Sequence, residues 1–135
     1  MRYLLTGAIK AGKSYRALQI ARSEFSKSLA FIATAEVTDA EMEERIAKHR
    51  RERLGSDGRE EFLTIEEPIE LDRAIDEACS LLTATPGNPG IVIDCIPMWV
   101  NNILYYHREQ DLPAILERAI AKLPEDTVIV TNEIG

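Results

Sequence analysis

The stretch Gly7-Ala8-Ile9-Lys10-Ala11-Gly12-Lys13-Ser14 decides the fold of this chain. It matches the phosphate-binding loop pattern G-x-x-x-x-G-K-[ST]. Its flanks also fit, because residues 3–6 read as a short buried strand and residues 15–21 read as the start of a helix. The alternative interpretation of this stretch is a turn between a strand and a helix that contains Gly-Lys-Ser by chance and binds no phosphate. The order of strand, glycine-containing loop and helix predicts a binding site for a nucleoside triphosphate.

The residue types in this loop suit phosphate chemistry. Glycines let backbone N–H groups turn toward phosphate oxygens, and the N-terminus of the following helix adds partial positive charge. Lys13 is expected to reach the β- and γ-phosphates, and the Ser14 hydroxyl is expected to ligate Mg²⁺. We therefore assign the whole loop to nucleotide binding, with the members Gly7, Ala8, Ile9, Lys10, Ala11, Gly12, Lys13 and Ser14.

The composition is that of one globular domain. The 135 residues suffice for a single core, and contents of 45% hydrophobic and 29% charged residues are ordinary for such a domain. The net charge of −7 argues against general binding to nucleic acid or to anionic membranes. The two cysteines form no disulfide framework, and no run reaches the roughly 18 apolar residues of a membrane helix. We expect one cytoplasmic domain over residues 1–135.

Strand and helix signals alternate along the chain. Strands are expected at about residues 2–6, 29–34, 62–65, 91–94 and 127–131, and helices at about residues 15–25, 38–54, 69–82, 98–107 and 111–123. The strands are continuously apolar, which is typical of a mostly parallel sheet covered by helices on both faces. The chain stops at Gly135, just after a core-like strand that a covering helix normally follows. We therefore expect the C-terminal part of the domain to be missing.

Acidic residues follow several of the expected strands. Asp94 closes the strand at 91–94, where phosphate-loop enzymes hold Mg²⁺ with a carboxylate, although many strands end in Asp because it starts a turn. Glu36, Glu66 and Glu133 follow other strands, at the edge where the catalytic loops of a parallel sheet emerge. These three glutamates either cap helices or line a cleft.

The expected helix at 38–54 ends in a cationic segment, in which five of the nine residues 45–53 are Lys or Arg. Cations at a helix C-terminus complement the helix dipole, so a solvated surface is one explanation. However, one face of the helix carries four residues at i, i+4, i+7 and i+11 spacing, namely Met42, Ile46, His49 and Arg53. A neutral imidazole among cations can attack a phosphorus atom. His49 is therefore either a core histidine or a nucleophile.

The order and spacing of several blocks resemble one family, the bifunctional adenosylcobinamide kinase / adenosylcobinamide-phosphate guanylyltransferases of cobalamin biosynthesis. The blocks span nearly the whole chain and comprise residues 7–14, 31–36 (FIATAE), 39–50 (DAEMEERIAKHR), 64–68 (TIEEP), 93–95 (IDC) with Trp99 and Asn102, and 131–135 (TNEIG). A phosphate loop alone fits many enzyme types, whereas the block that contains the histidine is far more specific.

The resemblance implies two reactions at one site. The first phosphorylates the aminopropanol hydroxyl of adenosylcobinamide. In the second, a histidine attacks the α-phosphate of GTP, expels pyrophosphate and carries GMP to the substrate phosphate. His49 matches that histidine, and with Lys13 it forms the implied catalytic pair. The resemblance also implies a RecA-like P-loop NTPase fold, GTP and ATP with Mg²⁺, a corrinoid substrate, and a homotrimer whose subunits share the site.

Further nucleotide contacts are implied by the resemblance. They lie in the turn after the second strand, in the segment after the histidine and at two strand ends, and comprise Thr34, Ala35, Glu36, Arg50, Arg51, Glu52, Arg53, Glu66 and Asp94. Ser14 and Asp94 are the implied metal ligands.

The chain departs from the family pattern at three places. Residues 7–11 differ from the usual Gly-Gly-Ala-Arg-Ser but keep the core loop pattern. Pro97 interrupts a Leu-Thr-Leu-Trp-like run and removes a backbone donor and a possible hydroxyl ligand near Asp94. The family also continues past the Asn-Glu-x-Gly block. Two other functions stay open, namely another small ATP-dependent phosphate-loop kinase in which His49 is structural, and a nucleotide-binding module without turnover.

Overall fold

The computed structural model describes residues 1–6, 13–25, 28–36, 40–52, 54, 62–82 and 89–131, without the side chains of Lys13, Ser14, Arg45, His49 and Glu52. Strands and helices alternate within this part of the chain. Their order is β1 (Arg2–Leu5), α1 (Lys13–Glu24), β2 (Leu29–Ala33), α2 (Ala40–Glu52), β3 (Phe62–Glu66), α3 (Leu71–Leu81), β4 (Gly90–Asp94), α4 (Ile96–Tyr105), the short 3-10 helix η1 (Glu109–Asp111), α5 (Leu112–Lys122) and β5 (Thr127–Val130).

The predicted alternation of strands and helices is confirmed, with shifts of two residues at several helix starts. α3 begins at Leu71, although the pattern predicted a start near Ile69. α4 begins at Ile96 and includes Pro97 in its first turn. Proline is well tolerated there because the first N–H groups of a helix have no partner within the helix. The proline therefore marks the start of α4, two residues earlier than predicted.

All five strands of the sheet are parallel, in the order β1-β5-β4-β2-β3. Since the strands are parallel, their carboxyl ends lie at the same edge of the sheet. The register places Ala33 of β2 opposite Glu66 of β3 on one side and opposite Asp94 of β4 on the other. Two acidic strand ends therefore flank the end of β2.

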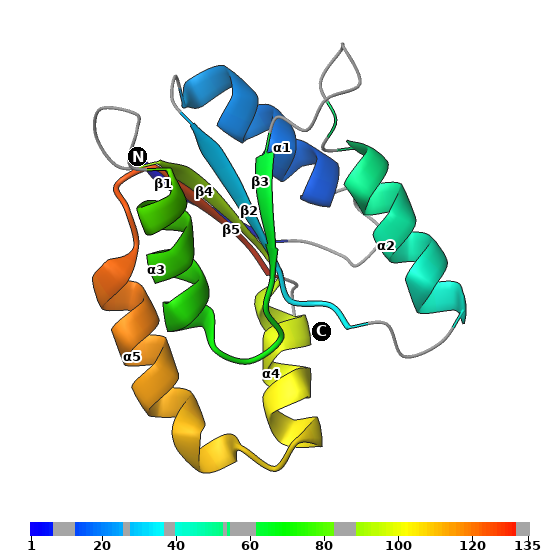
Figure 1. Cartoon of the computed structure of the whole chain (residues 1–135), viewed down its shortest axis with the longest axis vertical. Coiled ribbons are helices and arrows are strands. Elements are labelled where there is room, and N and C mark those ends of the chain that lie inside the picture. Colours follow the sequence, from blue (N-terminus) through cyan, green and yellow to red (C-terminus); the bar gives the residue numbers. More distant parts are fainter. Residues whose placement is uncertain are drawn as a thin grey trace.

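Helices cover both faces of the sheet, as predicted. Ile91 and Ile93 of β4 belong to a core cluster with residues of α3, α4 and α5, including Trp99. Val92, whose side chain points to the opposite face, packs in a second cluster with residues of α1, including Leu18. Figure 1 shows α3 and α5 on one side of the sheet and α1 on the other. The apolar strands β2, β4 and β5 thus reflect burial on two faces, whereas the edge strand β1 is partly exposed. The chain has the layered α/β architecture of P-loop NTPases.

Within the described ranges, no helix combines the length and the apolar character that crossing a membrane demands.

Candidate functional site

The N-terminus of α1 points toward the edge where the strands end. α1 begins at Lys13 and packs against β4 and β5. Phe25, just after its C-terminal end, contacts Gly90, the first residue of β4. The helix therefore runs antiparallel to β4, so its first turn lies at the carboxyl edge. The loop residues 7–12 lie outside the described part of the chain, as do the side chains of Lys13 and Ser14.

A pocket of about 460 Å³ lies at the same edge. It is lined by Ala35, Glu36, Ile46, Arg50, Glu66, Pro68 and Tyr106. Four of these residues, Ala35, Glu36, Arg50 and Glu66, are site residues that the sequence analysis named. They come from the turn after β2, from α2 and from the end of β3. The structure therefore brings together predicted residues from three separate segments.

Two polar contacts cross the pocket lining. Arg50 of α2 forms an ion pair with Glu66 at the end of β3, through Nη2 and Oε1. The hydroxyl of Tyr106 donates a hydrogen bond of 2.7 Å to Oε2 of Glu36. This bond, together with burial and the charge of Glu36, raises the pKa of Tyr106 above its ordinary value. A guanidinium and two carboxylates beside the apolar surface of Ile46 and Pro68 can bind a polar group that carries a flat or apolar part.

Tyr106 is a lining residue that the sequence analysis missed. It follows the last residue of α4 and is 47% exposed. An exposed tyrosine at a helix end is usually an ordinary surface residue, so the sequence offers only a weak signal. Its contact with Glu36 depends on where the fold places the end of α4 relative to the turn after β2.

Thr34 is buried beneath the turn that leads to Glu36. Its hydroxyl donates a hydrogen bond of 2.8 Å to the carbonyl oxygen of Cys95 and accepts one of 2.9 Å from the Cys95 N–H. Its own N–H donates to the carbonyl oxygen of Asp94 at 3.0 Å. Thr34 thus joins the ends of β2 and β4. Its predicted contact with nucleotide stays a prediction.

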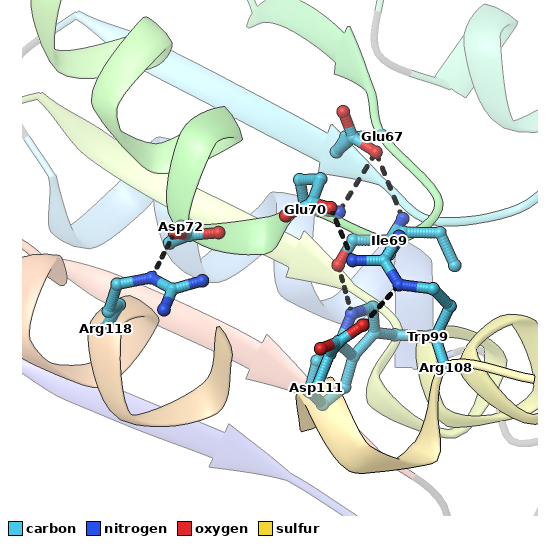
Figure 2. A network of polar contacts seen from close by, with 8 residues as sticks. All are labelled: Glu67, Ile69, Glu70, Asp72, Trp99, Arg108, Asp111 and Arg118. Atoms are coloured by element: carbon cyan, nitrogen blue, oxygen red, sulfur yellow. Dashed lines mark hydrogen bonds and ion pairs between the residues drawn. The ribbon is translucent and has the colours of Figure 1, made fainter. Parts of the chain in front are cut away.

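Figure 2 shows a polar network around the connection between β3 and α3. This connection also carries the lining residue Pro68. Glu67 accepts hydrogen bonds of 3.1 Å from the N–H groups of Ile69 and Glu70. Trp99 of α4 donates to the carbonyl oxygen of Ile69 at 2.6 Å. Arg108 bonds Glu70 at 3.0 Å and Asp111 at 2.5 Å. This wall of the pocket is therefore built by residues that the sequence analysis did not assign to the site.

Other predicted site residues lie away from the pocket lining or outside the described part. Asp94 is half-buried at the end of β4, before a cis peptide bond to Cys95. Arg51 is exposed on α2. Arg53, Glu133 and the side chains of His49 and Glu52 lie outside the described residues. The described residues include no group of three or more His, Cys, Asp and Glu side chains that could hold a metal ion.

Comparison with known proteins identifies the family. Residues 3–135 match the model described as cobinamide kinase / cobinamide phosphate guanyltransferase. The chain is 33% identical over 139 residues to the bifunctional adenosylcobalamin biosynthesis protein CobP of Pseudomonas aeruginosa, covering all of this chain and 73% of that protein. It is 29% identical over 151 residues to CobU of Escherichia coli, covering 100% of this chain and 76% of that protein. The chain belongs to the cobinamide kinase / cobinamide phosphate guanyltransferase family.

Proposed function

We propose that this chain performs both reactions in its family's description, the phosphorylation of cobinamide and the transfer of a guanylyl group to cobinamide phosphate. The observation that carries the proposal is the pocket lined by Glu36, Arg50 and Glu66 in a chain that the family model matches over residues 3–135. Residues 1–135 act as one nucleotide-binding domain. By resemblance, three cytoplasmic copies assemble into a homotrimer and share the site.

The triphosphate of GTP or ATP binds to residues 7–14, with Lys13 on the β- and γ-phosphates. The direction of α1 supports this assignment, because its N-terminus points toward the edge that holds the pocket. The remaining nucleotide contacts come from Thr34 to Glu36, from Arg50 to Arg53, and from Glu66 and Asp94. The cationic residues among these neutralise phosphate charge as it develops.

Mg²⁺ fits the donor set at the end of β4. Asp94 supplies carboxylate oxygens at the carboxyl edge, and Ser14, in the first turn of α1, supplies a hydroxyl. Mg²⁺ prefers oxygen ligands and commonly takes only one or two from the protein, the rest being phosphates and water. When bound, the ion neutralises charge on the β- and γ-phosphates.

His49 is the nucleophile of the guanylyl transfer in this proposal. An unprotonated imidazole nitrogen attacks the α-phosphorus of GTP, the bond to the bridging oxygen breaks, and pyrophosphate leaves with that electron pair. An oxygen of cobinamide phosphate then attacks the same phosphorus, and the P–N bond breaks to release the imidazole. His49 follows the pocket residue Ile46 by three residues on α2, a spacing that shares one helix face, and this supports the role.

A labelling experiment tests the proposal. The protein is incubated with α-labelled GTP and Mg²⁺, and acid-labile, alkali-stable label on protein is measured. We expect label on the wild type and on His107→Asn, but none on folded His49→Asn. His107 is the matched control, since the sequence has two histidines and His107 has a φ of 56°, which asparagine adopts readily. Lys13→Ala should abolish both reactions. ATP-dependent transfer without label would instead favour a kinase in which His49 is structural.

A further inference from the structure

Asn102 joins two turns of the pocket through one side-chain nitrogen. It lies in α4, is only 8% exposed, and its Nδ2 donates hydrogen bonds to the carbonyl oxygens of Thr34 at 2.7 Å and Pro68 at 3.1 Å. Thr34 begins the turn that carries Ala35 and Glu36, and Pro68 follows the end of β3. Asn102 therefore contacts the backbone of both segments that line the pocket at the sheet edge.

Asn102 binds the two segments just beyond the end of the β2–β3 pairing, which reaches Ala33 and Glu66. The N–H of Glu67 donates a backbone hydrogen bond of 2.9 Å to the carbonyl oxygen of Ala33. Beyond it, the carbonyl groups of Thr34 and Pro68 meet the amide of Asn102 instead. A side-chain NH₂ group carries two hydrogens, so one nitrogen can satisfy both carbonyls. One buried amide therefore bridges the two turns just beyond the end of their pairing in the sheet.

The neighbouring polar side chains of Trp99 and Thr34 form hydrogen bonds to other residues than Asn102 does. Trp99, three residues earlier on α4, donates its hydrogen bond to the carbonyl oxygen of Ile69 at 2.6 Å, in the β3–α3 connection. The Thr34 hydroxyl bonds the backbone of Cys95, which belongs to the β4 side. Asn102 is the residue of these three that spans both turns.

We propose that Asn102 is a positioning residue for the nucleotide pocket, because it bridges the turn that carries Glu36 to the segment at the end of β3 that carries Glu66 and Pro68. This inference rests on the proposed function, in which Glu36 and Glu66 contact the nucleotide. Asn102 acts through these backbones and does not touch the ligand. A pocket whose walls move by a fraction of an ångström or more loses contacts that depend on distance.

The first experiment needs no ligand. Amide hydrogen exchange is measured in the wild type, Asn102→Ala and two matched controls. Asn101→Ala removes the same residue type from an exposed neighbouring position, and Trp99→Phe removes the other buried donor of α4. We expect faster exchange at Thr34 and Glu67 in Asn102→Ala, and wild-type exchange there in both controls. Unchanged exchange at Thr34 and Glu67 in Asn102→Ala overturns the inference.

The second experiment measures GTP. Asn102→Ala should raise the Kd and KM for GTP about tenfold, with a much smaller change in kcat, as expected when positioning is disturbed. Asn102→Gln, which keeps both donors on a longer stem, should recover part of this affinity. If Asn102→Ala does not fold, Asn102→Ser, which keeps one donor, is compared with Asn102→Gln in the same way.

The controls separate positioning from stability. If Trp99→Phe lowers Tm as much as Asn102→Ala but keeps wild-type GTP affinity, the positioning role is supported. If both variants lose GTP affinity in proportion to Tm, or if Asn102→Ala binds GTP like the wild type, the inference is overturned. A wild-type protein that binds no GTP contradicts the proposed function and the nucleotide part of this inference. The hydrogen-exchange data test the link between the two turns without any ligand, so they are independent of that result.

Discussion

The hydroxyl of Tyr106 and the carboxylate of Glu36 are joined by a hydrogen bond of 2.7 Å, which connects the end of α4 to the turn after β2. Both residues line the pocket. The ring of Tyr106 also packs edge-on against Tyr105, with the ring centroids 5.1 Å apart. The orientation of a predicted nucleotide contact therefore depends on a residue 70 positions later in the chain.

Replacement of Tyr106 by Phe should show a defined pH dependence. The hydrogen bond to Glu36 raises the pKa of Tyr106 above 10.0, so protonated Tyr106 stabilises the fold at lower pH. This contribution is fully present below the unfolded-state pKa and is lost as pH rises through the folded-state value. The Tm of the wild type should therefore exceed that of Tyr106→Phe at pH 8, and the difference should shrink above about pH 10. Tyr105→Phe is the control, and a pH-independent difference would contradict the assignment.

The ion pair between Arg50 and Glu66 should matter more for binding than for stability. The two side chains are 52% and 49% exposed, and exposed pairs contribute roughly 0–1 kcal/mol to stability. Arg50→Ala should therefore unfold in urea almost like the wild type. Its affinity for GTP should fall about tenfold, because a charge-assisted contact is lost. Lys48→Ala, on the same helix and exposed, is the matched control; equal GTP affinity in both variants would refute a ligand role for Arg50.

The pair of Asp72 and Arg118 should stabilise the fold above the acid range. Burial acts to raise the pKa of Asp72, but the 2.8 Å hydrogen bond and the charge of Arg118 outweigh it, so the pKa lies below 3.8. Such a contribution is present above the unfolded-state pKa and is lost as pH falls through the folded-state value. Arg118→Met should be less stable than the wild type at pH 7, with a smaller difference at pH 3.

Lys122→Met offers the control for that measurement. Lys122 pairs with Asp76, whose side chain is 56% exposed, whereas the side chain of Asp72 is 8% exposed. The free energy of unfolding is measured in urea at pH 7 and at pH 3. At pH 7, Arg118→Met should lose clearly more of this free energy than Lys122→Met. Equal losses in the two variants would mean that burial of the carboxylate does not matter here.

Gly90→Ala should destabilise the domain by overpacking. A Cβ at this position would lie 2.8 Å from Cδ2 of Phe25 and 3.0 Å from Cδ2 of Leu29. Because Gly90 starts the buried strand β4, we expect the free energy of unfolding, measured in urea, to fall by about 1–3 kcal/mol. The double variant Gly90→Ala/Phe25→Leu should lose less than the sum of the two single variants, since a smaller side chain relieves the contact. Simple additivity would exclude Phe25 as the cause.

Local patterns predicted much of the fold. The order of strand, loop and helix at residues 1–25 and the continuously apolar strands indicated a parallel sheet, because these features depend on residues close in sequence. The start of α4 was predicted two residues late, since Pro97 is favourable in a first turn and unfavourable further inside a helix. The family resemblance was confirmed by the match over residues 3–135.

The candidate site was predictable only in part. Glu36, Arg50 and Glu66 were named from their blocks, and the structure shows that they line one pocket. The roles of Lys13, Ser14, His49 and Asp94 stay predictions. Tyr106 was not assigned to the site, because a tyrosine at a helix end has no distinctive local pattern. Asn102 was named only as a member of a family block, and its bonds to two turns depend on the placement of α4.

The sequence by itself determined the elements, the parallel class of the sheet and the family, because periodicity and motif spacing are properties of short segments. Only the tertiary structure decided the strand order β1-β5-β4-β2-β3 and the neighbours of each strand end. That order places Glu66 and Asp94 on the two sides of Ala33, and it lets one amide on α4 bind the turns after β2 and β3. The reason is physical, since pairing between distant strands is chosen by how both faces of the whole sheet are buried at once.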